Sequence, residues 1–423
     1  MTKRTEKTGG TQGANTEATS LGRLLAPLVD GTTTRRQLLA WVQSAGLVAL
    51  EAVFREEAAV LAGPKGRHDP TRTHHHWGAT PRQLTFGGRQ LSLPCPRVRS
   101  RAGREAALPS VQAFRATDPL TTRVMDQLLL GVSTRGYAAS LEAAPPGTQS
   151  RATSKSAVSR RLVTATRTQL TAELGRRLDE RDLVALFLDG VPIAGQTLIV
   201  ALGVAADGSK TPLGIRLGST ENAAICTELL QDLVTRGLRL HGRVLCVIDG
   251  GKGLRRALED VLGTGAVIQR CQLHKQRNLL ALIPQRRQPF VRAALRRAYR
   301  AASAAVARRQ LQTLTSWLES NGHPDAAASL REGLEETLTV LKLNLPPVLR
   351  RFFATTNCIE NLIATLRHVA RNVKRWRAGD MIHRWASLGL LRAAARFRRI
   401  KHHRDLPHLV RALRPDASTE VAA

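Results

Sequence analysis

Two aspartates, Asp189 and Asp249, end apolar runs of the kind that form buried strands. Asp189 ends the apolar run of LVALFLDG. Asp249 ends the apolar run of RVLCVIDGGKG and is followed by three glycines, a lysine and a basic helix. A glycine-rich turn after a strand often cradles phosphate, but GGKG lacks the spacing of the nucleotide-binding motif GxxxxGK[ST]. Two carboxylates at adjacent strand ends repel each other unless a cation lies between them, and hard oxygen ligands suit Mg²⁺ or Mn²⁺. Alternatively, Asp249 only caps the helix that begins near Lys252.

The elements around these aspartates predict an α/β fold. Two further strand patterns, TLIVALGVAADG and KTPLGIRLGST, are joined by Asp207-Gly208, a strong hairpin signal. An amphipathic helix at 221–238 precedes the run that reaches Asp249, and unbroken apolar runs indicate burial on both sheet faces. This order matches a ribonuclease-H-like core, in which the first and fourth strands are parallel neighbours. Asp189 and Asp249 would then meet outside the carboxyl ends of those strands, where open sheets form sites.

A third carboxylate would complete a two-metal site, and Glu360 in TTNCIENLIATLRHVARNVKRW is the candidate. Apolar residues recur through this segment at helical spacing, at Ile359, Leu362, Ile363, Leu366, Ala370 and Val373. Glu360 lies on the other face, followed there by Arg367, Arg371 and Lys374. Charges along a helix are ordinarily a solvated face. Here they also suit a metal ligand beside a bound phosphate backbone.

The charge balance predicts a polyanionic partner. The 423 residues carry 64 Lys and Arg against 33 Asp and Glu, a formal net charge of +31, which points first to nucleic acid and second to an anionic membrane. No apolar run approaches the ~20 residues of a spanning helix, and the polar N-terminus has no signal-peptide core. Five cysteines without a CxxC pair fit a reducing compartment. We therefore expect a soluble cytoplasmic protein.

Composition and periodicity divide the chain into consecutive parts. The central part is the α/β core, interrupted by a mostly helical insertion and preceded by helical DNA-binding regions. We expect a disordered tail at 1–20, a helical region with a hairpin around Gly87-Gly88 at 21–118, a helix-turn-helix-like region at 119–180, the first part of the core at 181–275, the insertion at 276–350, the Glu360 helix with a basic C-terminal region at 351–414, and a tail at 415–423.

The helix-turn-helix expectation rests on SKSAVSRRLV. Ser154 or Ser156 would cap a short helix with Val158 and Leu162 facing inward. The side chains facing outward, toward DNA, would be those of Lys155, Ser159 and Arg160. The alternative is any short basic amphipathic helix, because the motif is short and loose.

Four segments resemble the bacterial mutator-type insertion-sequence transposases, relatives of the eukaryotic Mutator and hAT elements. They are LDGV, VIDGGKGLRRAL, QRCQLHKQRNLL and TTNCIENL, they occur in the family's order, and they lie between Asp189 and about Arg375. The resemblance implies a DDE transposase in which Asp189, Asp249 and Glu360 hold Mg²⁺ or Mn²⁺. It also implies that the helical insertion accounts for the 111 residues that separate Asp249 from Glu360.

The implied activity is metal-dependent cleavage of DNA at insertion-sequence ends and joining of those ends to target DNA. The partners would be double-stranded DNA, both terminal inverted repeats and target, and a second copy of the chain in a dimer on DNA, with no membrane; the protein would associate with the nucleoid. Residues 367–414 carry 14 Lys or Arg against two acids, so we expect Arg375 and its basic neighbours, together with Lys252 and Arg255, to bind phosphate backbone. Trp376 and Trp385 would stack on DNA or pack in the core. A nuclease or resolvase that does not join strands, and an inactive DNA-binding derivative, remain as alternatives.

Cys271 and His274 form the family's C-x₂-H element. One Cys and one His at this spacing are half of a zinc site, and no second pair follows nearby, so a structural or DNA-proximal role is favoured over zinc. His274 as a general base is a further alternative. The run His74–His76 and Cys95 offer additional ligands, although a histidine-rich surface loop is the simpler interpretation.

Overall fold

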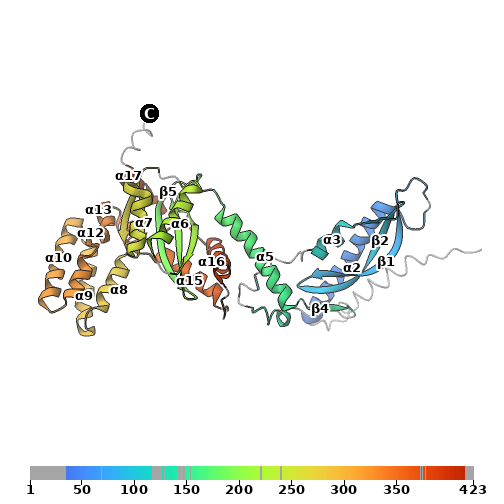
Figure 1. Ribbon diagram of the computed structural model, residues 1–423, viewed down its shortest axis with the longest axis horizontal. Coiled ribbons are helices and arrows are strands. Elements are labelled where there is room, and N and C mark those ends of the chain that lie inside the picture. The colour runs from blue at the N-terminus through green and yellow to red at the C-terminus, as the bar shows by residue number, and fades with distance from the viewer. Residues whose placement is uncertain are drawn as a thin grey trace, which may run out of the picture. The chain divides into compact units, whose positions relative to one another are not determined.

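The computed structural model describes residues 35–414, apart from residues 68, 117–125, 128–129, 131, 142–143, 145–147, 153, 220–221, 239–240, 372, 374 and 377. The chain divides into two compact units, residues 1–162 and 163–423 (Figure 1). The expected tails at 1–20 and 415–423 lie outside the described residues, and the expected junction at residue 180 lies within the second unit. Among the helices described, none is both long and apolar enough to cross a membrane.

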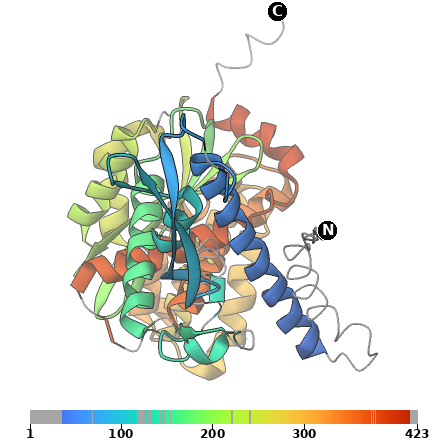
Figure 2. The same ribbon diagram turned by 90° about the vertical axis from the view of Figure 1, so that its right-hand side faces the viewer.

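The first unit packs a long helix against a four-stranded sheet (Figure 2). Its elements are α2 (Arg35–Ala62), β1 (His74–Phe86), β2 (Arg89–Ser100), β3 (Glu105–Ala106), α3 (Pro109–Ala116), η1 (Ala138–Ser140) and β4 (Ser150–Ala152). Gly87 and Gly88 join β1 to β2 with φ angles of 58° and 79°, a conformation that glycine adopts without steric cost. The predicted hairpin is therefore confirmed. Phe54 of α2 is fully buried in a shared core with Leu84 of β1 and Leu91 of β2.

This unit contains more strand than its sequence predicts. The hairpin begins at His74, so His74–His76 pair with Ser100, Arg99 and Val98 of β2, and the prediction of a histidine-rich loop is wrong. Likewise the expected helix-turn-helix-like region at 119–180 contains a strand, because Ser150–Ala152 pair with Leu91, Gln90 and Arg89 of β2. Both strands are stabilised by partners far along the chain, which local periodicity does not contain.

Helix α5 (Lys155–Leu174) has 20 residues, so the predicted short helix is only its beginning. The Ser154 hydroxyl accepts a hydrogen bond from the Ala157 N–H at 3.3 Å, which confirms one of the two predicted caps. Val158 and Leu162 are buried, whereas the predicted outward residues Lys155, Ser159 and Arg160 are exposed. The residues directly before α5 form β4, whereas a helix-turn-helix needs another helix across a short turn. The helix-turn-helix prediction is therefore wrong for this part of the described chain.

The second unit is built on a five-stranded mixed sheet with the order β7-β6-β5-β8-β9. The strands are β5 (Leu183–Ile193), β6 (Gln196–Ala205), β7 (Lys210–Gly218), β8 (Val244–Ile248) and β9 (Ala266–Arg270). β5 pairs antiparallel with β6 and parallel with β8. The first and fourth strands of this sheet in chain order, β5 and β8, are thus parallel neighbours, as predicted.

Helices cover both faces of this sheet (Figure 1). One face packs on α6 (Ala223–Thr235) and α7 (Lys252–Leu262), which η2 (Gly263–Gly265) follows. The other face packs on α14 (Pro347–Phe353), α15 (Asn357–Ala370), α16 (Ala378–Ala394) and α17 (Leu406–Leu413), the last of which η4 (His403–Asp405) precedes. Along β5, Leu186 and Leu188 enter the core beneath α6 and α7, whereas Phe187 enters the opposite core. Burial of alternate residues on two faces explains the unbroken apolar run.

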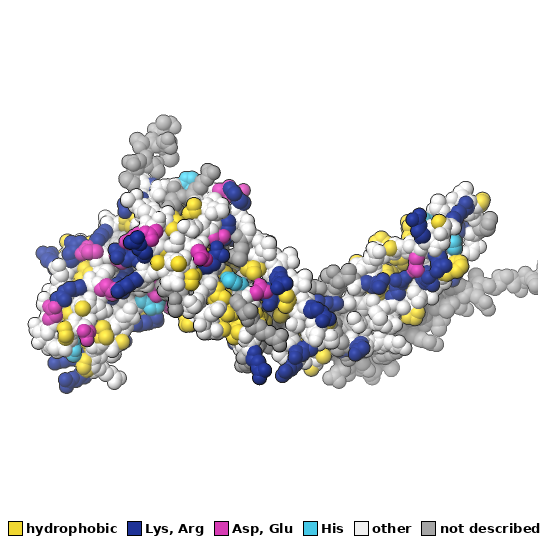
Figure 3. Space-filling model, in the orientation of Figure 1, with side chains coloured by type: hydrophobic (Ala, Val, Ile, Leu, Met, Phe, Trp, Pro, Cys, Tyr) yellow, Lys and Arg dark blue, Asp and Glu magenta, His cyan; other side chains and the backbone are white. Residues whose placement is uncertain are grey.

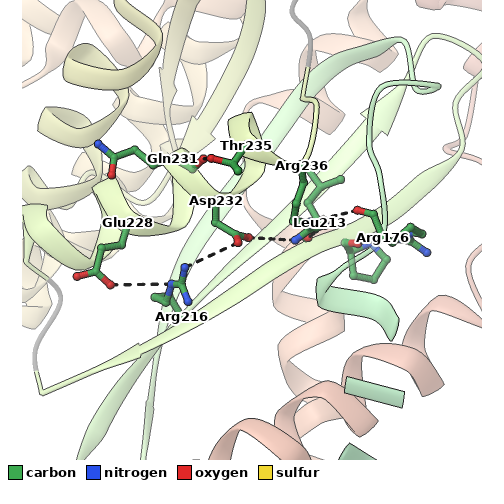
Figure 4. Close-up of polar contacts among 9 residues, drawn as sticks. Arg176, Leu213, Arg216, Glu228, Gln231, Asp232, Thr235 and Arg236 are labelled. Carbon is green, nitrogen blue, oxygen red and sulfur yellow. Dashed lines mark hydrogen bonds and ion pairs between the residues drawn. The ribbon is translucent and has the colours of Figure 1, made fainter. Parts of the chain in front are cut away.

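An arginine at the end of α6 ties this helix to the sheet (Figure 4). The Arg236 guanidinium is only 8% exposed; it donates hydrogen bonds to the carbonyl oxygens of Leu213 at 2.7 Å and Arg176 at 3.1 Å, and it pairs with Asp232 at 3.1 Å. Buried guanidinium groups are tolerated when their donors are satisfied in this way. Arg216 of β7 adds weaker ion pairs, 3.9 Å to Asp232 and 4.0 Å to Glu228.

A helical segment follows β9, as predicted for residues 276–350. It contains α8 (Gln272–Ala281), η3 (Gln285–Arg287), α9 (Gln288–Tyr299), α10 (Ala304–Ser320), α11 (Pro324–Arg331), α12 (Leu334–Thr337) and α13 (Thr339–Lys342). These helices share a core of their own around Leu279, Val291, Leu295 and Leu311. Lys275 of α8 is fully buried and donates hydrogen bonds to the carbonyl oxygens of Ser329 and Glu332, so α8 is held against α11.

Candidate active site

Asp189 and Asp249 lie at matching positions on the neighbouring strands β5 and β8. Leu188 of β5 pairs with Ile248, the last residue of β8; Asp189 is the next residue within β5, and Asp249 directly follows β8. Asp189 is 7% exposed and Asp249 is half-buried. The two residues are therefore level with each other where β8 ends, as predicted, but Asp189 does not end its strand. β5 continues to Ile193 because residues 190–193 pair with the beginning of β6.

Asp189 is electrostatically coupled to the other two candidate acids. Burial raises its pKa most, the negative charge of Asp249 adds to the rise, and Glu360 contributes further, whereas the charge of His274 opposes them; together they bring the pKa to about 7. A carboxylate is stabilised by cations and destabilised by burial and by like charges. The three predicted acids thus act on one another, although Glu360 lies 171 residues beyond Asp189 in the chain.

The glycines after Asp249 have structural roles. A Cβ atom on Gly250, whose φ is +108°, would lie 2.2 Å from Nε of Arg270, and one on Gly253 would lie 3.0 Å from the backbone of Asn222. The Asp249 carboxylate accepts a hydrogen bond from the Gly251 N–H at 2.9 Å. Helix α7 receives no side-chain cap, so Asp249 is not its N-cap.

We expect Gly250→Ala to destabilise the fold by about 1–3 kcal/mol, because alanine is strained at positive φ and its methyl group would overlap the Arg270 side chain. Gly195→Ala is the matched control, since Gly195 also has positive φ (+76°) but nothing within 4 Å of its Cβ position. Urea denaturation of both variants measures the difference. Equal destabilisation would show that the contact with Arg270 contributes nothing.

Glu360 lies in the first turn of α15, held by a neighbouring threonine. The Thr356 hydroxyl donates to Glu360 Oε1 at 2.9 Å, and His274 Nε2 lies 3.8 Å from the same oxygen. The predicted apolar stripe of α15 is buried, except Val373, which is half-buried. A Cβ on Gly389 of α16 would lie 2.7 Å from Leu366 Cα. Helix α16 therefore approaches α15 closely on the apolar side, and Glu360 remains on the side of the strand ends.

Cys271 and His274 belong to the network that positions Glu360. The buried Cys271 sulfur accepts hydrogen bonds from the Thr356 N–H at 3.4 Å and from the His274 N–H at 3.5 Å, and it lies 3.4 Å from the Thr356 hydroxyl oxygen. Burial alone would raise the pKa of the Cys271 thiol, but the hydrogen bonds from His274 and Thr356 lower it overall. The hydrogen bond with Cys271 raises the pKa of His274; burial opposes this, and the charges of Cys271, Asp189 and Asp249 add to it.

Thr356 is the residue of this site that sequence reasoning missed. It is fully buried and contacts Cys271, His274 and Glu360. Its position directly before the helix and four residues before Glu360 was the available signal, because a side chain four residues earlier on a helix reaches the same face. The contact with Cys271, 85 residues away, had no counterpart in the local pattern.

The residues fit a hard divalent cation better than zinc. Carboxylate oxygens are the ligands of Mg²⁺ and Mn²⁺, and the mutual repulsion that raises the pKa of Asp189 is what such an ion relieves. The Cys271 thiol is instead engaged with Thr356 and His274. Among the described residues, no group of three or more His, Cys, Asp or Glu side chains is already arranged to hold a metal ion. This applies to His74–His76 with Cys95 and also to Asp189, Asp249 and Glu360, whose side chains would have to close around an ion.

The predicted DNA-binding residues have different surroundings. Lys252, Arg367, Arg371 and Arg375 are exposed. Arg255 pairs with Glu336 at 2.7 Å and Glu259 at 3.2 Å, so part of its charge is neutralised. Lys374 lies outside the described residues. Figure 3 shows Lys and Arg side chains spread over the visible face of each unit.

The two tryptophans assigned to stacking or core packing, Trp376 and Trp385, are both half-buried. Because each shows neither full exposure nor full burial, their surroundings leave both assignments open.

The fold and site define a mixed α/β protein with three coupled carboxylates in a strongly basic chain. The chain belongs to the family described as "Transposase, Mutator family", whose pattern matches residues 41–387. This range contains all three acids and extends well beyond the segments that carry the resemblance in the sequence. The protein is accordingly a transposase, an enzyme that binds DNA and acts on it by transesterification.

Its relatives carry transposase names in several bacteria. It is 30% identical to "Transposase for insertion sequence element IS6120" of Mycolicibacterium smegmatis over 60% of this chain and 80% of the relative. It is 32% identical to the transposase for IST2 of Acidithiobacillus ferrooxidans over 46% of this chain and 62% of the relative. The transposase for IS406 of Burkholderia multivorans is 27% identical over 76% of this chain and 82% of the relative.

Proposed function

We propose that this transposase is of the DDE type, with a ribonuclease-H-like core in which Asp189, Asp249 and Glu360 cut DNA at insertion-sequence ends and join those ends to target DNA. The observation that carries the proposal is that Asp189, within β5, lies level with Asp249, which directly follows the parallel neighbour β8, and that Glu360 acts on the same buried carboxylate. The strand order β7-β6-β5-β8-β9 supports the assignment of the core.

The side chains of this site have different proposed roles. Asp189, Asp249 and Glu360 would hold Mg²⁺ or Mn²⁺, which when bound supplies activation of the attacking hydroxyl and stabilisation of the departing 3′ oxygen. Thr356 orients the Glu360 carboxylate through its hydroxyl. The charges of Asp189 and Asp249 contribute to the raised pKa of His274, so protonation of His274 would reduce the repulsion among the acids.

Incubation with Mg²⁺ and DNA carrying the ends of the insertion sequence that encodes the protein tests the proposal. Cut ends together with joined products support it. Cut ends without joined products would make the protein a nuclease or resolvase of the same fold. Binding without cutting, in Mg²⁺ and in Mn²⁺, would identify an inactive derivative. DNA with scrambled ends and reactions in EDTA are the controls.

The proposed partners are terminal inverted repeats, target DNA and a second copy of the chain. The net charge of +31 supports the DNA partners. A dimer on DNA and association with the nucleoid remain proposals; sedimentation of the protein with and without end DNA tests the dimer.

Binding to non-specific duplex should weaken steeply with salt, because each contacted phosphate releases counterions. We expect log K against log[salt] to fall with a slope of about −0.9 per contact. The double variant Arg367→Gln/Arg371→Gln should make the slope shallower by up to about 1.8. Arg308→Gln, which removes a side chain already paired with Glu335, should leave it unchanged. A wild-type slope near zero would contradict the electrostatic binding mode.

A further inference from the structure

A pocket of about 550 Å³ lies beside the helix that carries Glu360. Asn357, Asn361 and Thr365 line it at intervals of four residues, so they form one strip of α15. Its volume falls within the range of about 300–1,000 Å³ typical of sites for small organic groups. The strip neighbours Glu360 on the helix surface without including it.

The pocket is positively charged. Lys210, Arg351, Arg396 and Lys401 line it, and no Asp or Glu does. None of these four cations forms an ion pair with a carboxylate among the described residues, in contrast to Arg255, Arg308 and Arg399. Cations that converge without acidic partners favour an anionic ligand, and phosphate is the anion that a DNA-binding enzyme meets.

The remaining lining supplies what a nucleobase needs. The amides of Asn357 and Asn361 offer donors and acceptors, and the rings of Phe352 and Phe397 offer apolar surface. The Lys210 ammonium lies 4.8 Å from the Phe397 ring centroid, so an aromatic face and a cation are presented together. Single-stranded DNA is bound by this combination of aromatic rings and positive charge.

We propose that this pocket binds an unpaired nucleotide of the DNA strand on which the enzyme acts, with its phosphate at the cations and its base between the amides and the rings. The proposal deepens the proposed function and rests on it. Thr355 lines the pocket, and the next residue, Thr356, donates to Glu360. A strand held here therefore passes within one residue of the group that orients the third carboxylate.

The amides argue for an unpaired base rather than duplex DNA. In a duplex the hydrogen-bonding edges of bases lie within the grooves, and a pocket that contacts only the outer backbone does not reach them. An unpaired base exposes its whole edge and both faces. Asn357 and Asn361 are then specificity residues, and the four cations set affinity.

Cys358 gives a site-specific readout, because it lines the pocket and the other four cysteines are buried. Burial raises the pKa of the Cys358 thiol to about 11, so labelling with iodoacetamide is slow but measurable at pH 8.5. We expect an eight-residue thymidine oligonucleotide, in EDTA, to protect Cys358 severalfold in peptide mass spectrometry. Thymidine monophosphate, inorganic phosphate and a blunt duplex of equal length should protect much less.

Each other result overturns the proposal. Absence of protection by the oligonucleotide would show that the pocket does not take a DNA strand. Equal protection by monophosphate or phosphate would assign the pocket to a free anion, and equal protection by the duplex would assign it to the duplex backbone.

Charge-removing variants give an independent arm, measured as oligonucleotide affinity by fluorescence anisotropy. Arg396→Gln/Lys401→Gln removes two exposed lining cations and should weaken binding at least about 10-fold and make the salt slope shallower by up to about 1.4. Arg398→Gln/Arg404→Gln, which removes two exposed cations outside the lining, is the matched control. An equal loss of oligonucleotide affinity in the two double variants would refute specific binding in the pocket.

These measurements are made without metal, so they are distinct from the test of catalysis. Protection of Cys358 without DNA cleavage in Mg²⁺ would leave the pocket in place and refute the DDE proposal. Cleavage and joining of DNA without protection of Cys358 would support the DDE proposal and refute the pocket proposal.

Discussion

Replacing Glu360 by glutamine is expected to abolish DNA cleavage and joining while DNA binding persists or tightens. Glutamine has nearly the same helix propensity and Glu360 lies off the buried stripe of α15, so the fold should be unchanged. The substitution removes the negative charge that we assign to the third metal ligand. We expect the cleavage rate to fall by about 10³-fold or more, on the scale of losing a catalytic group.

The matched control for this variant is Glu336→Gln. Glu335 and Glu336 are the next candidates for a third acid, but Glu336 pairs with Arg255 at 2.7 Å, and Glu335 pairs with Lys342 at 2.8 Å and with Arg308 at 2.5 Å. Carboxylates already neutralised in this way are poor candidates for a metal ligand. Cleavage by Glu336→Gln should therefore be retained. Wild-type cleavage by Glu360→Gln would show that the third ligand lies elsewhere.

Asp189→Asn is expected to stabilise the metal-free protein at pH 8 while it eliminates cleavage. Burial and the charges of Asp249 and Glu360 raise the pKa of Asp189 from 3.8 to about 7 in the folded protein. The folded state therefore holds a proton that the unfolded chain has lost between pH 4 and pH 7, and wild-type stability falls as the pH rises through this window. Above pH 7 the cost is complete, at about 2–4 kcal/mol.

Asparagine does not titrate, so the free energy of unfolding of the variant should exceed that of the wild type at pH 8 and match it near pH 4. Urea denaturation in EDTA at both pH values measures this. Added Mg²⁺ should stabilise the wild type and not the variant, because ligands that bind only the folded state raise its stability. A wild type with flat pH dependence and a variant that is less stable at pH 8 would contradict the electrostatic coupling of Asp189.

The carboxylate site therefore lowers the stability of the protein without metal. Asp189 is buried, Asp249 and Glu360 are half-buried, and the negative charges of the latter two act on Asp189. The neighbours that favour the charged acids are the Thr356 hydroxyl, which donates to Glu360, and His274. Functional sites commonly carry such local costs. The raised pKa of Asp189 thus supports the proposal that this site binds a cation.

Much of the core followed from the sequence by itself. Apolar runs that are buried on both faces predicted the neighbouring strands β5 and β8, and the positions of Asp189 and Asp249 in those runs placed the two residues level with each other. The continuation of β5 past Asp189 was not predicted. Helical periodicity separated Glu360 from the buried stripe of α15, and Gly87-Gly88 predicted the hairpin. These features depend on residues close together in the chain, whose alternation directly reports which side is buried.

Only the tertiary structure decided the features that depend on distant partners. Strand β4 forms because β2, about 60 residues earlier, offers an edge, and this replaced the predicted helix-turn-helix. The contact between Cys271 and Thr356 spans 85 residues, and the basic pocket combines Lys210 with residues of α14, α15 and the segment that ends at Lys401. Local periodicity states which face of an element is buried but not which element buries it. The three candidate carboxylates could therefore be identified from the sequence, whereas the contacts that support them depend on tertiary packing.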